Sequence, residues 1–178
     1  SVFASLPIAD IDRAAGRSTD FWKDWIAHDS YDDYWQRISN RDEYGSILSP
    51  AYNMGGWFDP FVGGTFENFN GLRNHGGSAE AKHSKIIVGP WKHPLSISTK
   101  TGDVDFGGHS QVDLDSEDLR WFDYWLRGVD NGIVNEPPIR LFIMGSNVWR
   151  DEHAWPLDRT DWQKWYLHSA GGANTLRG

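Results

Sequence analysis

The stretch Tyr52-Asn53-Met54-Gly55-Gly56-Trp57-Phe58-Asp59 decides the fold class that this sequence predicts. It is an apolar run that passes two glycines and an aromatic pair and ends on a carboxylate, as a strand that delivers an acid would. A second run, Lys85-Ile86-Ile87-Val88-Gly89-Pro90-Trp91-Lys92-His93, ends in Gly-Pro and then presents a histidine. The interval between the runs leaves room for a helix and two short loops, which indicates a βαβ unit of a parallel sheet. Because functional groups of such sheets gather at the carboxyl ends of the strands, Asp59 and His93 are expected at one edge.

Helical patterns lie between and after these two strands. Gly63-Gly64 is expected to break the chain, and residues 65–73 then predict a helix because their apolar residues recur at a spacing of three. Residues 119–127 predict a second helix that ends at Gly128, with Asp115 or Ser116 as its cap. The polar, glycine-rich loop 96–108 is longer than a simple connection requires. We therefore expect it near the sheet edge that carries Asp59 and His93.

The first part of the chain, residues 8–36, predicts charged and strongly aromatic helices, and residues 30–38 suggest a short helix of their own. Ser18 or Thr19 is a suitable cap for the helix that follows it. One apolar stripe along that helix consists of Phe21, Trp22, Trp25 and Ile26. Two interpretations stay open: the stripe packs between helices, or it belongs to a helical cap over a cleft.

The last part of the chain changes to a strand pattern. Residues 130–138 have the composition of a linker, and residues 139–145 and 164–167 predict strands. A second, β-rich domain is therefore expected to begin here. It stops almost at once, because two or three strands do not bury a core of their own.

Composition predicts a folded protein and excludes several functions. Of the 178 residues, 39% are hydrophobic and 15% aromatic, including 11 tryptophans. The net charge of -8 provides no basic field for nucleic acid or an anionic membrane. No apolar run reaches the roughly 20 residues that span a bilayer. Because cysteine and a signal-peptide pattern are both absent, the compartment stays unknown between cytoplasmic and exported.

An Asp and a His at the ends of successive strands suit the acid–base part of a catalytic triad. The carboxylate would accept the imidazole Nδ1 proton, while Nε2 would take a proton from a nucleophile and return it to the leaving group. In α/β-hydrolases the order is Ser, Asp, His, and this sequence lacks the Gly-x-Ser-x-Gly motif of the nucleophile. Spacing alone leaves open an ordinary buried Asp59 and a surface His93.

Two other classes of function compete with the hydrolase reading. His75, His83, His93 and His109 suggest a metal site, but their spacings match neither a helical i, i+4 pair nor a fixed ligand set. No metal and no cofactor is therefore predicted. The tryptophans also allow a non-catalytic binding module whose rings stack on a ligand, although a strand-ending Asp and His argue against it.

Several blocks of this sequence resemble the CocE/NonD hydrolases, a group of acyl esterases, α-amino-acid ester hydrolases and X-Pro dipeptidyl-peptidases of peptidase family S15. The most specific blocks are Gly55-Gly56-Trp57-Phe58-Asp59 and Gly89-Pro90-Trp91-Lys92-His93, in this order. Similar blocks lie at 28–35, 140–145, 149–152 and 155–157, so the resemblance runs nearly end to end.

The resemblance implies the fold class α/β, with this chain as the C-terminal part of an α/β-hydrolase core. Residues 1–48 would be the end of a helical cap, residues 49–135 the part of the core that carries Asp59 and His93, and residues 136–178 the first strands of a jelly-roll domain. The triad Ser, the tyrosine of the oxyanion hole and most of the central sheet would precede residue 1.

The resemblance also implies a function. Asp59 and His93 match the triad acid and base, and Phe61 matches an aromatic position that lines the acyl pocket. The substrate would be a small ester or a short peptide, with no cofactor, nucleic acid or membrane as partner. The chain would need the N-terminal part of the hydrolase core and be inactive alone, and a homo-oligomer stays open.

Overall fold

One four-stranded sheet organises the structure, a computed structural model that describes residues 2–93, 98–166 and 168. The strands are β1 (Tyr52–Phe58), β2 (Lys85–Lys92), β5 (Ile139–Ile143) and β6 (Val148–Glu152). They lie in the order β1-β2-β5-β6, with β1, β2 and β5 parallel and β6 antiparallel to β5. The α/β class expected from the sequence is therefore confirmed, with a mixed sheet.

The βαβ unit forms around helix α4 (Val62–His75), which connects β1 to β2. The two strands pair in parallel from Tyr52↔Lys85 to Gly56↔Gly89. The expected break at Gly63-Gly64 is wrong, because α4 runs through both glycines. Packing overrides the low helix propensity of glycine here, since Phe66 and Phe69 of the same helix are buried against the sheet.

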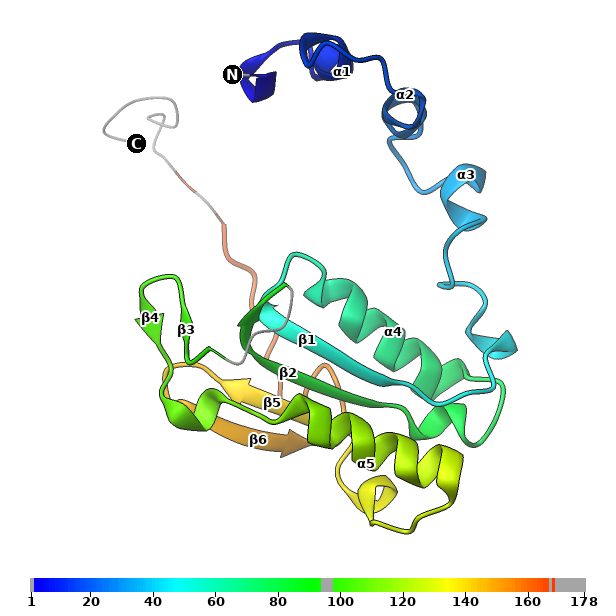
Figure 1. Ribbon diagram of the computed structural model, residues 1–178, viewed down its shortest axis with the longest axis vertical. Helices are drawn as coiled ribbons and strands as arrows, with labels where there is room; N and C mark the ends of the chain where they lie inside the picture. Colours follow the sequence, from blue (N-terminus) through cyan, green and yellow to red (C-terminus); the bar gives the residue numbers. More distant parts are fainter. Residues whose placement is uncertain (1, 94–97, 167, 169–178) are drawn as a thin grey trace.

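The opposite face of the sheet is covered by helix α5 (Leu114–Arg127) (Figure 1). Its N-cap is Asp113, which accepts a hydrogen bond from the Ser116 N–H at 3.1 Å, so the expected cap at Asp115 or Ser116 is wrong by two or three residues. The predicted end at Gly128 is confirmed, because Gly128 takes the left-handed conformation with φ of 69°. Successive side chains of a strand point to opposite faces of the sheet, which explains why β1 contacts a helix on each face. Trp57 faces α4, and Tyr52 faces α5.

The main core lies between α4 and the sheet. Both faces of the parallel strands are covered, which is why β2 is a nearly continuous apolar run. The cluster of buried residues consists of Phe66, Phe69, Ile86, Val88, Ile139 and Leu141.

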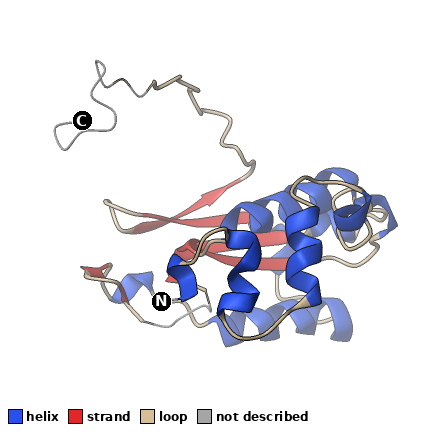
Figure 2. Ribbon diagram, turned by 90° about the horizontal axis from the view of Figure 1, so that it is seen from above, coloured by secondary structure: helices blue, strands red, loops and turns tan. Residues whose placement is uncertain are grey.

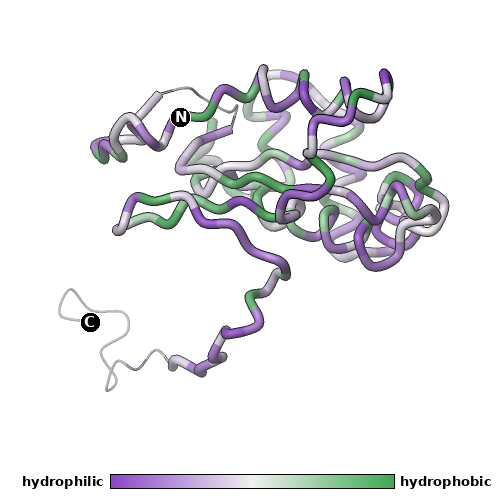
Figure 3. Tube along the Cα trace, turned by 90° about the horizontal axis from the view of Figure 1, so that it is seen from below, coloured by the Kyte–Doolittle hydropathy of each residue, from purple (hydrophilic) through white to green (hydrophobic). Residues whose placement is uncertain are grey.

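Strand β5 lies beyond the domain boundary that the sequence predicts, yet it belongs to the main sheet. Residues 136–178 were expected to begin a separate jelly-roll domain, but Ile86↔Ile139 to Val88↔Leu141 pair β5 directly with β2. Strands β5 and β6 therefore belong to the same sheet as β1 and β2, and the division of the longer protein into domains stays a prediction. The strand expected over 164–167 is also absent from 164–166, and Leu167 lies outside the described residues. Figure 3 shows that the chain leaves β6 as a largely hydrophilic stretch.

The expected loop 96–108 holds a small hairpin in its described part, residues 98–108. Strands β3 (Lys100–Thr101) and β4 (Val104–Asp105) pair antiparallel. Thr101 anchors the hairpin by donating its hydroxyl hydrogen bond to the Pro90 carbonyl of β2 at 2.7 Å. Phe106, which follows the hairpin, is buried. A short 3₁₀ turn at Gly108–Ser110 leads on to α5.

An N-terminal arm extends away from the sheet (Figure 1), and the view from above in Figure 2 looks down on its helices in front of the strands. Two contacts attach its base to α4: Arg41 forms an ion pair with Glu67, and the Tyr44 hydroxyl donates to Asn68 at 2.9 Å. The aromatic stripe of the arm is not buried, since Phe21 is 56% and Trp25 47% exposed. The helical elements of the arm are η1 (Val2–Ala4), η2 (Ile8–Asp10), α1 (Ile11–Ala14), α2 (Asp20–Ala27), α3 (Asp33–Gln36) and η3 (Tyr44–Ser46).

Two short 3₁₀ turns complete the described elements, η4 (Ala81–His83) before β2 and η6 (Ile133–Asn135) before β5. Across residues 2–93, 98–166 and 168, no helix combines the length and the apolar character that a membrane crossing requires.

Candidate active site

Asp59 lies immediately after β1, at the carboxyl edge of the parallel strands, and only 7% of it is exposed. A tight turn fixes it: the Asp59 N–H donates to the Gly56 carbonyl at 3.0 Å, and the Val62 N–H donates to the Asp59 carbonyl at 3.2 Å. The Phe61 N–H donates to the carboxylate Oδ1 at 2.8 Å. One carboxylate oxygen is thus held by the backbone, which leaves Oδ2 for another partner.

That partner is His93, which follows β2 at the same edge. The distance from His93 Nδ1 to Asp59 Oδ2 is 3.0 Å. The His93 side chain is 58% exposed, whereas the Asp59 side chain is 5% exposed. The structure therefore brings the two residues together as the sequence predicts, with a buried acid behind an accessible imidazole. Their catalytic roles stay a prediction.

The charge state of the pair follows from its hydrogen bonds. The Phe61 N–H, and after it the His93 ring, hold the pKa of the Asp59 carboxyl below its ordinary value of 3.8, although burial acts in the opposite direction. Asp59 is therefore a carboxylate at neutral pH. A carboxylate only accepts hydrogen bonds, so the bond at 3.0 Å assigns the proton to His93 Nδ1 and leaves Nε2 as the acceptor of the neutral ring.

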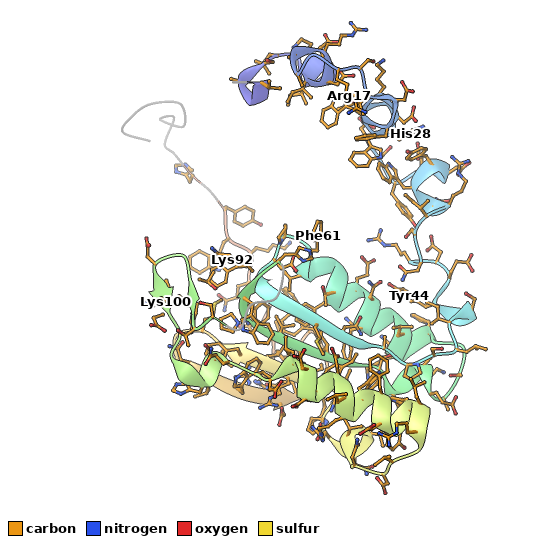
Figure 4. All side chains as sticks on the ribbon, in the orientation of Figure 1. Arg17, His28, Tyr44, Phe61, Lys92 and Lys100 are labelled. Atoms are coloured by element: carbon orange, nitrogen blue, oxygen red, sulfur yellow. The ribbon has the colours of Figure 1, made fainter. Side chains whose placement is uncertain are left out.

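Phe61 stands beside the histidine. The two rings meet edge to face, with their centroids 5.4 Å apart and an interplanar angle of 85°. Phe61 is 64% exposed, and Figure 4 shows it at the start of α4, at the edge where β1 ends. An exposed aromatic ring beside an acid–base pair is suited to contact an apolar group of a substrate.

Glycines allow the two strands to deliver these residues. A Cβ on Gly56 would lie 2.2 Å from the Trp91 carbonyl oxygen, and a Cβ on Gly89 would lie 2.4 Å from the Trp91 ring. The pairing shifts register just after Gly56, so that Phe58 faces Lys92. The close approach of β1 to β2 and the register shift together place Asp59 directly opposite His93. In the sequence these glycines indicate only the end of an apolar run. No pattern in the sequence predicts the register shift between β1 and β2.

The other histidines of the rejected metal site lie on separate elements: His75 ends α4, His83 lies in η4 and His109 in η5. Among the residues that the structure describes, no three His, Cys, Asp or Glu side chains form a group suited to a metal ion.

Sequence reasoning missed a second His–Asp pair, which lies in the arm. His28 Nδ1 is 2.5 Å from Asp32 Oδ2, and the His28 ring stacks on Tyr34 at 4.4 Å. Asp32 also accepts a hydrogen bond from the Tyr34 N–H at 3.0 Å, which caps α3. The i, i+4 spacing is the signal for this pair. Because it joins α2 to α3 locally, it stabilises the arm rather than forming a site with Asp59.

Tryptophans of the sheet region pack mainly against one another and against phenylalanine. Trp91 and Trp121 are buried, and Trp57 and Trp155 flank Phe66. Ring packing of this kind stabilises a core and forms no continuous ligand platform. The exceptions are Trp162 and Trp165, which are 78% and 90% exposed.

Solved structures of other proteins share the fold of this chain. The chain shares the fold of an aminopeptidase from a marine sediment Thaumarchaeota archaeon, with a TM-score of 0.67 and 22% identity over 84% of this chain and 25% of that one. It also resembles a CocE/NonD family hydrolase from Staphylococcus aureus, with a TM-score of 0.53 and 17% identity over 79% of this chain and 22% of that one. The sheet is thus part of a hydrolase-like α/β fold.

The sequence model of the X-Pro dipeptidyl-peptidase (S15) family matches residues 4–94, and the chain belongs to this family. Cocaine esterase from Rhodococcus is 33% identical over 86% of this chain and 26% of its own length. A putative serine esterase from Mycobacterium tuberculosis is 32% identical over 89% of this chain and 27% of its own length. The chain therefore spans about a quarter of the length of the relatives it matches.

Proposed function

We propose that this chain is the acid–base part of a serine hydrolase that cleaves ester or amide bonds through a Ser-Asp-His triad, with the Ser outside residues 1–178. One observation carries the proposal: the 3.0 Å contact between His93 Nδ1 and Asp59 Oδ2 at the carboxyl edge of parallel strands. Membership of the S15 family and relatives named as esterases support it.

The proposed reaction follows from the tautomer of His93. Asp59 holds the Nδ1 proton, so Nε2 accepts the proton of the Ser hydroxyl as its oxygen attacks the substrate carbonyl. The imidazolium then gives this proton to the leaving alcohol or amine, and an acyl-enzyme remains. A water attacks the acyl-enzyme in the same way and releases the acid and the free Ser. Every proton is carried by His93, so the steps need no cofactor.

The substrate class is a small ester or a short peptide. Relatives that are named cocaine esterase and putative Xaa-Pro dipeptidyl-peptidase support these two classes. Phe61 is proposed to line the acyl pocket, because its exposed ring touches His93. The proposal includes no nucleic-acid or membrane partner, in keeping with the charge of -8, and it does not depend on a homo-oligomer.

The proposed organisation of the longer protein has three parts. Residues 1–48 form the end of a helical cap, which the exposed aromatic stripe of the arm supports. The proposed core begins at residue 49 and extends through β6 to Glu152, beyond the boundary at 135 expected from the sequence, because β5 and β6 continue the sheet of β1 and β2. A jelly-roll domain would begin only after the sheet ends.

A serine-directed fluorophosphonate probe tests this function against a binding module. The longer protein is expected to be labelled, because the probe phosphorylates an activated Ser, and His93→Ala should reduce the rate of labelling at least a hundredfold. The 178-residue chain should stay unlabelled under the same conditions. Absence of labelling in the longer protein, measured by intact mass, would favour the binding module.

A further inference from the structure

The hairpin of β3 and β4, together with the turn that follows it, lies at the end of the sheet to which β1 and β2 point (Figure 1). We call residues 98–110 the edge segment. Figure 4 shows its Lys100 at the same end of the sheet as Lys92, the residue before His93. The proposed reaction gives the edge segment no role, yet its contacts reach the ends of both strands that carry the acid–base pair.

The place of the His93 ring depends on how the ends of β1 and β2 lie relative to each other. The side chain is 58% exposed, so burial does little to hold it. Its contacts with the Asp59 carboxylate at 3.0 Å and with the Phe61 ring come from residues that follow β1, whereas His93 itself follows β2. A small movement of one strand end against the other would therefore break the acid–base contact.

The pairing of β1 with β2 is irregular just before these two residues. Gly56 pairs with Gly89, and the next pair is Phe58 with Lys92. One residue of β1, at position 57, thus stands opposite two residues of β2, at positions 90 and 91, which is the arrangement of a β-bulge. Because a bulge disrupts the ladder locally, regular strand pairing does not by itself fix the two strand ends.

Thr101 of the edge segment holds the bulge on the β2 side. Its hydroxyl donates to the carbonyl of Pro90 at 2.7 Å, three residues before His93. Thr101 is 7% exposed, and the Pro90 side chain is fully buried, so water cannot readily replace this donor. The hairpin holds the hydroxyl in place, since Thr101 pairs with Val104 across it.

Phe106 of the edge segment holds the β1 side. This ring is 5% exposed and lies 6.0 Å from the ring of Phe58, the residue that directly precedes Asp59. It also meets Phe142 of β5 edge to face at 5.9 Å. The edge segment therefore touches β2 just before the base and β1 just before the acid.

The far end of the edge segment is attached to the sheet as well. The Trp149 ring N–H of β6 donates to the His109 carbonyl at 2.7 Å, and the Trp149 ring packs 5.7 Å from Trp91 of the bulge. Inside the segment, the Phe106 N–H donates to the Thr99 carbonyl at 2.8 Å. These contacts make the edge segment a fixed support.

We infer that the edge segment positions the acid–base pair, with Thr101 as the positioning residue for His93 and Phe106 as the positioning residue for Asp59. Both act through the backbone of the strand ends and not on the substrate. The inference rests on the proposed function. Because the hydroxyl of residue 101 is the group that acts, Ser should replace Thr there, whereas Val, which has the shape of Thr without the hydroxyl, should not.

NMR of the His93 ring in the 178-residue chain tests the inference without any need for activity. Long-range ¹H–¹⁵N spectra, recorded where the ring is neutral, show which nitrogen carries the proton, and the signals are assigned by their loss in His93→Ala. The unsubstituted chain and Thr101→Ser should carry the proton on Nδ1. In Thr101→Val the ring should separate from Asp59, and the form protonated on Nε2 should become a major species.

A matched control separates positioning from stability. Thr160→Val makes the same substitution at an exposed threonine beyond β6 and should leave the His93 spectrum unchanged. If Thr101 were merely structural, Thr101→Val would lower the midpoint of thermal unfolding but leave the proton of the folded molecules on Nδ1. That result would overturn the inference.

Kinetics of the longer protein provide a second readout. Thr101→Val should lower kcat for p-nitrophenyl acetate about 10- to 100-fold, because a misplaced base loses the reactive geometry, while KM changes less than about threefold. Thr101→Ser should stay within about threefold of the unsubstituted protein in both constants. Equal kcat values for Thr101→Val and Thr101→Ser would count against the positioning role of the hydroxyl.

Phe106→Leu decides the question if Thr101→Val does not fold. It keeps the hydroxyl contact and an apolar side chain but weakens the packing on Phe58, so the form of His93 protonated on Nε2 should again appear. A spectrum of Phe106→Leu identical to that of the unsubstituted chain would then refute the inference.

The two settings keep this inference distinct from the proposed function. If Thr101→Val moved the His93 proton but the longer protein hydrolysed no ester in a His93-dependent way, the proposed function would fail and the positioning would stand. If hydrolysis required His93 while neither the spectrum nor kcat responded to Thr101→Val, the positioning would fail and the proposed function would stand.

Discussion

Replacing Asp59 with Asn in the longer hydrolase is expected to lower kcat/KM for an ester substrate by about 10⁴-fold. The carboxylate is 5% exposed and accepts the Nδ1 proton of His93 at 3.0 Å. An amide in its place can present its NH₂ group to Nδ1 and favour the wrong tautomer, in which Nε2 carries the proton and accepts none from Ser. Steady-state kinetics with p-nitrophenyl acetate measures the effect.

The chain contains a matched control for this experiment. Asp32→Asn changes the carboxylate of the other His–Asp pair, in which His28 Nδ1 lies 2.5 Å from Asp32 Oδ2. Because that pair joins two helices of the arm, its loss should change kcat/KM only a few-fold. If Asp59→Asn had as small an effect as Asp32→Asn, Asp59 would not be the triad acid.

Replacing Gly56 with Ala should cost about 3 kcal/mol of the free energy of unfolding. The new Cβ would lie 2.2 Å from the Trp91 carbonyl oxygen, an atom of the backbone that cannot move without shifting β2. This shift would also pull His93 away from Asp59, so activity should fall together with stability. Urea unfolding followed by tryptophan fluorescence measures the change.

Two other glycines serve as controls for Gly56. A Cβ on Gly55 would meet only the Thr65 side chain at 3.3 Å, and a Cβ on Gly63 would meet no atom within 4 Å. Gly55→Ala should therefore have a small effect, and Gly63→Ala in α4 should stabilise the chain by about 0.5–1 kcal/mol. An unfolding midpoint for Gly56→Ala equal to that of the unsubstituted chain would contradict the close approach of the strands.

The sequence was informative wherever a local pattern determined the structure. The two apolar runs predict β1 and β2, and the position of an acid and a base just after them predicts a meeting at the carboxyl edge. Arg127 and Gly128 predict the end of α5, since the left-handed residue follows from glycine itself. Each of these features depends on residues within a few positions of one another, or on the general geometry of parallel sheets.

Features that depend on distant contacts could not be predicted in this way. The pattern of residues 139–143 indicates a strand but not its partner, so β5 was expected in a second domain although it pairs with β2. Gly63-Gly64 taken alone predicts a break in the helix. The burial of Phe66 and Phe69, which the sequence does not reveal, outweighs that local preference. The register shift after Gly56, which brings Asp59 level with His93, depends on the packing of Trp91.

In the arm, too, local patterns predict the helices but not the contacts that cover them. Aromatic periodicity predicts helices there, and α2 forms at Asp20–Ala27 after Thr19. Thr19 occupies the N-cap position, although its side chain makes no cap hydrogen bond. Periodicity also predicts an apolar stripe but not what covers it, and Phe21 and Trp25 are about half exposed in this chain.

Ester hydrolysis after recombination tests the central claim most directly, which is that Asp59 and His93 serve a Ser outside this chain. The 178-residue chain and a separately produced upstream part are assayed on p-nitrophenyl acetate, alone and together. Assayed separately, neither part should hydrolyse the ester faster than the His93→Ala control. The mixture should hydrolyse it, and this activity should be lost when the 178-residue chain carries His93→Ala. Hydrolysis by the 178-residue chain alone that is lost on His93→Ala would contradict the account.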